Sequence, residues 1–228
     1  MEQLNSISEA IALSMGAAWA SGINLYATIL VLGILGVTEN IILPENLQIL
    51  THPMVMTGAG LMFITEFIAD KVPGVDSGWD AVHTFIRIPA GAILAAGAVG
   101  EVSPALSLTA GILGGGLAAG THAAKAGTRA LINTSPEPFS NWTASVAEDL
   151  TVIGAIWTAL NYPVVFICFL LMSILLMIWL IPKLWRGIKK VFAAIVRLLG
   201  GERPSDLRLP GERPPKIEGP PGKSAGEC

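Results

Sequence analysis

The feature that most constrains this chain is where its basic residues lie relative to its apolar stretches. Long apolar stretches fill residues 8–182, and all 14 Lys and Arg residues can be assigned to one set of alternate ends of these stretches. About 20 apolar residues are needed to cross the roughly 30 Å hydrocarbon core of a bilayer. Because hydropathy and charge agree on one arrangement, the sequence predicts a protein that crosses a membrane several times.

The composition excludes an ordinary soluble domain. Of the 228 residues, 52% are hydrophobic and only 14% are charged, and the mean hydropathy is +0.62, whereas soluble domains carry about 25% charged residues. The net charge of −3 and the position of the basic residues beside apolar segments argue against a nucleic-acid partner. Neither Cys168, inside an apolar run, nor Cys228 indicates a disulfide framework or a cysteine metal site.

The apolar stretches predict an all-α membrane protein, a bundle of about six transmembrane helices of which some are short or re-entrant. Prolines mark most of the breaks, because a proline lacks the N–H that continues a helix. We expect the spans near residues 8–36, 53–71, 79–100, 104–124, 144–160 and 163–182. The alternative is a four-span bundle in which 79–100 or 144–160 only re-enters, since the uncharged part of each is short.

The loops predict the orientation of the bundle. The loops near 37–52, 101–103 and 161–162 contain no Lys or Arg, and the basic residues fall at the opposite ends of the spans. The positive-inside rule then puts both termini in the cytoplasm. We therefore expect a multi-pass protein of an inner (plasma) membrane.

Two further segments follow the bundle of residues 1–182. Residues 183–199 interleave apolar residues with five basic ones, as expected of an amphipathic helix on a bilayer surface rich in anionic lipid. Residues 200–228 contain six of the 15 prolines and repeat the string Gly-Glu-Arg-Pro, which is typical of a disordered tail. We expect this tail in the cytoplasm.

Charged residues at helical spacing lie at the ends of the middle spans. Residues three or four positions apart share one face of a helix. This spacing predicts one stripe of Asp76, Asp80, His83 and Arg87 and another of His122, Lys125, Arg129 and Asn133. The second span ends with Glu66 and Asp70, and the fifth begins with Glu148 and Asp149.

These residues predict a polar network inside the bundle. An unpaired ionised group near the membrane centre costs about 2.5–3.5 kcal/mol on insertion scales, so such groups turn inward, pair, or line water. The network either encloses a functional cavity, which we favour, or consists of ion pairs that fix the helix register. His83 or His122 is a candidate proton relay, or a ligand of a divalent metal beside the acids. Because no metal-binding spacing is present, we expect no metal.

The first span has a polar interruption at mid-depth, at Gly22 and Asn24. The interruption is either a local unwinding beside a binding site or a helix-packing contact, and packing is the more frequent use of such residues. Glycines between residues 111 and 120 form a small-residue face that also favours close packing, within the bundle or in a homo-oligomer.

Three strings of the sequence resemble a known family. They are ASGINLYATILVLG at 20–33, DKVPGVDSGWDAVHTFIRIPAGA at 70–92 and THAAKAGTRALINTSPEPFSNWTASVAEDL at 121–150. Together they look like a bacterial family of membrane proteins known as domain of unknown function 4126, over roughly residues 8–182. The resemblance implies an integral membrane protein and no particular activity or substrate.

We expect a small transport protein, a transporter or channel, for a small polar or charged solute or ion. In this hypothesis Lys125 and Arg129 contact the solute, and four acids bind a coupling cation or proton, namely Glu66, Asp70, Glu148 and Asp149. One alternative is a scaffold that binds lipid or partner proteins. Another is an enzyme that acts on a lipid headgroup through Asp76, Asp80 and His83, although no hydrolase, kinase or dinucleotide motif supports it. No cofactor is indicated.

Overall fold

The computed structural model describes residues 2–72, 74–99, 103–134 and 138–198, and every regular element in these ranges is a helix. The helices are α1 Glu2–Ile23, α2 Leu25–Val37, η1 Glu45–Thr51, α3 Pro53–Ala69, α4 Val75–Val99, α5 Pro104–Ile132, α6 Pro138–Asn161 and α7 Pro163–Leu198. Residues Met1–Lys190 form one compact unit, the bundle. The all-helical fold class is therefore confirmed for the described residues.

The helix starts follow from local chemistry. Pro53 and Pro104 each stand in the first helical turn, where the missing N–H has no helical partner to lose. Ser103 caps α5 by accepting a hydrogen bond of 3.1 Å from the Leu106 N–H, and His52 caps α3 through Nδ1 in the same way. The breaks that the sequence predicted at these prolines are present.

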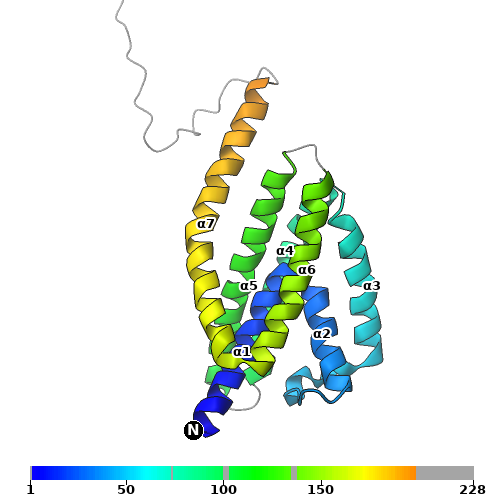
Figure 1. Ribbon diagram of the computed structural model, residues 1–228, viewed down its shortest axis with the longest axis vertical. Helices are drawn as coiled ribbons and strands as arrows, with labels where there is room; N and C mark the ends of the chain where they lie inside the picture. The colour runs from blue at the N-terminus through cyan, green and yellow to red at the C-terminus, as the bar shows by residue number, and fades with distance from the viewer. Residues whose placement is uncertain (1, 73, 100–102, 135–137, 199–228) are drawn as a thin grey trace, which may run out of the picture. The chain divides into compact units, whose positions relative to one another are not determined.

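Helices α1 and α2 form a hairpin that enters and leaves the bundle at one end. Ser14 of α1 donates a hydrogen bond of 2.8 Å to the Ala95 carbonyl near the end of α4, and α1 then rises to the middle of α4. The chain breaks at Asn24, whose backbone is extended (φ −144°, ψ 100°). From there α2 descends along α3 to η1, where Gly33 lies against the Leu50 carbonyl. Figure 1 shows the two blue helices meeting in the middle of the bundle.

The expected single span at 8–36 is therefore wrong. Asn24 ends the first helix halfway through the bundle, because its side chain caps α2 in place of continuing α1. Both halves of the expected span are shorter apolar helices, Ile7–Ile23 and Leu25–Val37. The chain thus returns to the end from which it entered.

The two ends of the bundle unit lie far apart. Glu9 near the start of α1 lines the same pocket as Pro44 just before η1. Gly187 of α7 lies against Leu131 in the last turn of α5, at the opposite end. We call the end with Glu9 and Pro44 the η1 end, and the end with Gly187 and Leu131 the network end. This arrangement differs from the expected one, in which both termini share a side.

Helices α4 and α5 form the most extensive helix pair, and α1 packs against both of them. Small residues allow this close approach: a Cβ on Gly114 of α5 would meet the Ala95 side chain of α4, and a Cβ on Gly91 would meet Ala118. Packing of small residues is what the glycine pattern between 111 and 120 predicted, and it fixes the two polar stripes of α4 and α5 face to face.

In the part of the chain that the structure describes, two helices are long and apolar enough to cross a membrane, Val75–Val99 and Pro163–Ala194. Helix η1 and α3 together supply a third candidate with a bend of 65° between them. This is fewer than the six spans expected from the sequence. α5 and α6 are long, with 29 and 24 residues, and both contain members of the polar network, which lowers their hydropathy.

Helix α7 continues through Pro182 without a break. The expected boundary between the bundle and an interfacial helix at 183–199 is therefore not a helix end, although the compact unit does end at Lys190. The position of that segment on anionic lipid stays a prediction. The tail predicted at 200–228 lies outside the described residues.

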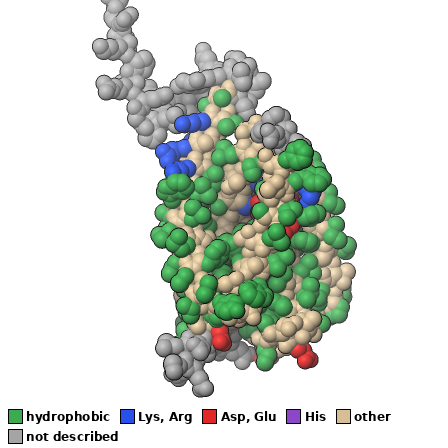
Figure 2. Space-filling view, viewed as in Figure 1, with side chains coloured by type: hydrophobic (Ala, Val, Ile, Leu, Met, Phe, Trp, Pro, Cys, Tyr) green, Lys and Arg blue, Asp and Glu red, His purple; other side chains and the backbone are tan. Residues whose placement is uncertain are grey.

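The two ends of the bundle differ in charge. At the η1 end the acids Glu9, Glu39 and Glu45 are exposed, and the described residues there include no Lys or Arg. Exposed basic residues, among them Lys183 and Lys190, lie at the network end. Figure 2 shows a group of blue side chains near one end and red ones at the other, with a few more red and blue atoms visible in the largely green and tan surface between them. This surface fits a protein that lies in a bilayer.

The hairpin predicts that residues 9 and 190 lie on opposite sides of the membrane. We expect Glu9→Cys and Lys190→Cys, each made in a background lacking Cys168 and Cys228, to react with a membrane-impermeant maleimide from opposite sides of sealed vesicles. Both positions are exposed in the bundle. Labelling of both from the same side contradicts the re-entrant hairpin.

The α4–α5 contact predicts different effects at two neighbouring glycines. Gly114→Ala places a methyl group against Ala95, and we expect it to cost about 1–3 kcal/mol of stability by overpacking. Gly116→Ala is the matched control, because nothing lies within 4 Å of the added Cβ, and a helical alanine is favoured over glycine by up to about 1 kcal/mol. Thermal unfolding in detergent measures both; equal midpoints refute the close packing.

Candidate functional site

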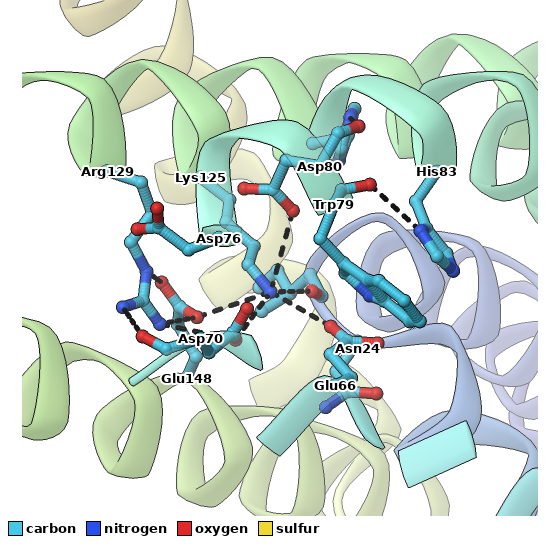
Figure 3. Close-up of polar contacts among 12 residues, drawn as sticks. Asn24, Glu66, Asp70, Asp76, Trp79, Asp80, His83, Lys125, Arg129 and Glu148 are labelled. Carbon is cyan, nitrogen blue, oxygen red and sulfur yellow. Dashed lines mark hydrogen bonds and ion pairs between the residues drawn. The ribbon is translucent and has the colours of Figure 1, made fainter. Parts of the chain in front are cut away.

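The ammonium group of Lys125 lies at the centre of a buried charge network (Figure 3). Its Nζ is 3.0 Å from Glu66 Oε1, 3.2 Å from Asp70 Oδ2, 3.4 Å from Glu148 Oε2 and 3.9 Å from Asp80 Oδ1. These acids belong to the end of α3, to the turn after it, to α6 and to α4. The charge network is defined as Glu66, Asp70, Asp80, Arg87, Lys125, Arg129 and Glu148.

Arg87 joins α4 to α3 and to the hairpin. Its guanidinium forms an ion pair with Glu66, and its Nη1 lies 3.4 Å from Asp80 Oδ1. The same Nη1 donates to the Ile23 carbonyl at 2.9 Å, and Lys125 Nζ donates to that carbonyl at 3.1 Å. The last carbonyls of a helix carry partial negative charge, so two cations stabilise the end of α1.

Arg129 holds α6 to α5. Its Nη2 and Nε donate to the two Glu148 carboxylate oxygens at 2.7 and 3.1 Å, a bidentate pair. Its Nη1 donates to the Asp70 carbonyl at 3.1 Å and to the Asn141 carbonyl at 3.0 Å. The Arg129 side chain is fully buried, whereas Glu148 is 17% exposed. Glu148 is therefore the outermost carboxylate of the network.

The hairpin tip, residues 22–26, reaches this network from the η1 end. Asn24 accepts a hydrogen bond of 2.9 Å from the Ala27 N–H and so caps α2. Its amide nitrogen donates to Asp149 of α6 at 2.8 Å. Gly22 packs so closely on α5 that a Cβ there would meet the Thr121 side chain. The sequence left unwinding and packing as alternatives for this segment, and the structure shows both a break in the helix and close packing.

The two candidate proton relays, His83 and His122, each have one ring nitrogen hydrogen-bonded to a backbone carbonyl. His83 Nδ1 lies 2.9 Å from the Trp79 carbonyl, which only accepts, so Nδ1 carries the proton and Nε2 accepts from the Tyr26 hydroxyl at 3.0 Å. His122 Nε2 lies 3.1 Å from the Asp80 carbonyl, and its Nδ1 faces Arg87.

This geometry separates the two candidate proton relays. A proton on His122 Nδ1 would stand against the Arg87 guanidinium, which is always charged, so His122 is held neutral. His83 has a hydroxyl partner at its free nitrogen and keeps the option of exchanging a proton with Tyr26.

Asp76 and Asn133 form a separate pair at the network end. The Asn133 amide donates to both Asp76 oxygens, at 2.7 and 2.9 Å, and accepts from the Asn141 amide at 2.7 Å. The Asp76 carboxylate also accepts from the backbone N–H groups of Gly74 and Ser77 at the start of α4. Asp76, the second residue of α4, is thus engaged by three donor groups, and among the described residues it pairs with no cation of the charge network.

The charge network contains more acid than base. Its four carboxylates face three cations, which leaves one negative charge when all are ionised, and Asp149 beside it has the neutral partner Asn24. Several of its buried oxygens make no hydrogen bond: Glu66 Oε2, Asp70 Oδ1 and both oxygens of Asp80. A cation or a proton is what such oxygens lack.

All thirteen residues singled out in the sequence lie in one connected region, with Asn24 and Asp149 at the tip and Asp76 with Asn133 at the rim. The two helical stripes are present on α4 and α5. The sequence analysis missed Tyr26 and Trp79, which bond to His83, and Asn141, whose carbonyl accepts from Arg129. Only Trp79, four positions before His83, had a sequence signal that helical spacing could have found.

The geometry does not favour a metal. Among the described residues no three His, Cys, Asp or Glu side chains are placed to hold a metal ion. The acids instead converge on the nitrogen atoms of Lys125 and Arg129. These two cations, expected to contact a solute, are engaged by carboxylates.

The cap at the hairpin tip predicts a measurable effect. Asn24→Ala removes the α2 cap and leaves Asp149 without its donor, and we expect a loss of about 2 kcal/mol. Asn40→Ala is the control, since that side chain is exposed beyond the end of α2. Thermal unfolding followed by tryptophan fluorescence measures both. A loss no larger than in the control means that the tip is not held by Asn24.

A comparison with protein families gives one match, to a model described as a domain of unknown function, DUF4126, over residues 11–183. No curated protein and no solved structure matches the chain. The matched range contains the hairpin, the whole charge network and most of α7 up to its first basic residue. It confirms the resemblance inferred from the three sequence strings. The chain therefore belongs to the DUF4126 family, a family of proteins named for a domain of unknown function.

Proposed function

We propose that this protein carries a small cationic solute or ion across a membrane, with the charge network as its binding site. The observation that carries the proposal is the helix break at Asn24, whose flanking carbonyls and side chain reach a buried network with a surplus of acid. The energetic cost of burying the network, the geometry of the helix break and the charge balance of the network each support it.

The cost of the network argues for a role beyond packing. Seven ionisable side chains meet in the interior, and six of them are at most 4% exposed. Burying charge is expensive even when it is paired, and apolar side chains often serve stability as well or better. In membrane proteins such residues mark the paths of solutes, ions and protons.

The helix break supports the same function. Transporters commonly bind their substrates at discontinuous helices, where free backbone groups near the membrane midplane contact ions. The α1–α2 hairpin has this form: the Gly22 and Ile23 carbonyls end one helix, and Asn24 starts the next. Non-helical backbone at membrane depth is tolerated where protein or a polar cavity surrounds it.

The charge balance favours a cation over an anion. Lys125 and Arg129, the expected anion contacts, already bind four carboxylates between them. The unpartnered groups at the centre are mainly carboxylate oxygens. Asp149 and Glu148, which are partly exposed, stand on the side from which a cation would enter.

The proposal goes with a revised path of the chain. We propose that α3 to α7 each cross the membrane, and that the α1–α2 hairpin enters from the η1 end and returns to it. The basic network end then faces the cytoplasm of a cell whose inner membrane holds the protein, in keeping with the positive-inside rule. The basic part of α7 would contact anionic lipid there.

The enzyme alternative has less support, because its three residues are occupied. Asp76 accepts from the Ser77 N–H and from Asn133, and His83 is held between Trp79 and Tyr26. Asp80 belongs to the charge network.

Ion flux into proteoliposomes tests the proposal. Purified full-length protein is reconstituted, and uptake is measured separately for protons, Na⁺, K⁺ and methylammonium. We expect flux of at least one of these cations above that of empty vesicles. Glu66→Gln, which keeps the side-chain shape, should lower that flux about tenfold, equivalent to about 1.4 kcal/mol.

Glu45→Gln is the matched control, because Glu45 is an exposed acid of η1 outside the network. We expect wild-type flux from this variant, and thermal unfolding must show that both variants are folded. Absence of flux for every cation, or equal flux in the two variants, refutes the proposal.

A further inference from the structure

The surroundings of the Lys125 ammonium are those of a bound ligand. Five oxygens lie within 3.9 Å of Nζ, four of them carboxylate oxygens and the fifth the Ile23 carbonyl. They come from α3 and the turn after it, α4, α6 and the hairpin tip, whereas Lys125 itself comes from α5. The side chain is 2% exposed. We call this set of oxygens the ammonium cage.

The cage holds more acceptors than Lys125 can satisfy. An ammonium group has three N–H donors, and here the Ile23 carbonyl, Glu66 and Asp70 receive them. Asp80, 1% exposed, has no hydrogen bond to either oxygen, although its Oδ1 lies 3.4 Å from Arg87 Nη1 and 3.9 Å from Lys125 Nζ. Figure 3 shows the Asp80 carboxylate facing Lys125. The second oxygens of Glu66 and Asp70 are also buried without a donor. These oxygens point to a further N–H donor.

The chemistry of the cage selects among cations. A metal ion needs several ligand oxygens at short and regular distances, and the described residues offer no such group. Three of the cage oxygens, on Glu66, Asp70 and the Ile23 carbonyl, instead lie at hydrogen-bond distance from a primary ammonium. An ion without N–H groups, such as tetramethylammonium, leaves the unpartnered oxygens as they are.

We propose that the ammonium cage takes a primary ammonium group as its ligand, in exchange with the ammonium group of Lys125. This inference rests on the proposed function and names the substrate class of the same site. The end of the Lys125 side chain has the same chemical structure as the proposed ligand, because its last two heavy atoms, Cε and Nζ, correspond to those of methylammonium.

The exchange follows from the position of Glu148. Lys125 lies 3.4 Å from Glu148, the most exposed carboxylate of the cage. A lysine stem is long and flexible, so its ammonium can move toward Glu148 while an incoming ammonium takes the bonds to Glu66, Asp70 and Asp80. One positive charge replaces another in the inner part of the cage, and the added charge offsets the surplus carboxylate.

Binding of radiolabelled methylammonium to purified full-length protein tests the exchange. Lys125→Ala opens the space of the side chain and removes the resident competitor. We expect this variant to bind methylammonium about tenfold more tightly than wild type, as expected when an internal competitor occupies about nine tenths of the sites. Tetramethylammonium should neither bind nor compete, and methylammonium should raise the unfolding temperature of Lys125→Ala.

A second variant keeps the test valid if Lys125→Ala is too unstable. Lys125→Ala with Asp80→Asn has the same net charge as wild type and loses one wall of the cage. We expect it to fold and to bind methylammonium about tenfold less tightly than Lys125→Ala, which is about the affinity of wild type. If Lys125→Ala unfolds on purification, methylammonium in the buffers should restore the folded yield.

The outcomes separate this inference from the proposed function. Equal binding of methylammonium and tetramethylammonium, no tighter binding in folded Lys125→Ala, or no restoration of an unfolded one overturns the inference. If Na⁺ or proton flux depends on Glu66 while methylammonium does not bind, transport stands and the ammonium ligand is refuted. If methylammonium binds as expected and no cation crosses the vesicles, the ligand class stands and transport is refuted.

Discussion

The pairing of three buried cations with acids from other helices sets the position of every element around them. Arg87, Lys125 and Arg129 connect α4 and α5 to α3, α6 and the hairpin. Leaving one of these charges without its partner costs about 3–5 kcal/mol, so a helix cannot shift along its neighbour without a large penalty. The hairpin depends on the same pairing, because two of the cations occupy the carbonyl at the end of α1.

This pairing stabilises the bundle, but it does not use all the acidic groups of the network. A network that only held helices together would be neutral and fully hydrogen-bonded, whereas this one keeps a spare carboxylate and buried oxygens without donors. Real proteins break such rules at functional sites. The small residues of the α4–α5 contact have the complementary role, since they bring the two polar stripes close enough to share their partners.

Much of this arrangement could be predicted from the sequence, because proline positions and helical spacing are local signals. Pro53 and Pro104 gave the helix starts, and the spacing of Asp80, Lys125 and their neighbours gave two buried stripes. The direction of the hairpin had no such signal: a single Asn inside an apolar run is compatible with a continuous span. The chain turns because of tertiary contacts: Asp149 accepts a hydrogen bond from the Asn24 side chain, and Lys125 binds the Ile23 carbonyl before the break. The helix break at Asn24 is one difference from the expected topology, and the low hydropathy of α5 and α6 is another.

The hairpin also has a consequence for how the protein is made. Residues 7–37 begin and end at the same end of the bundle and carry a polar tip into its interior. The side chains that bind this tip lie on α4, α5 and α6, which are synthesised later. The hairpin therefore reaches its final place only after the chain has been made as far as α6.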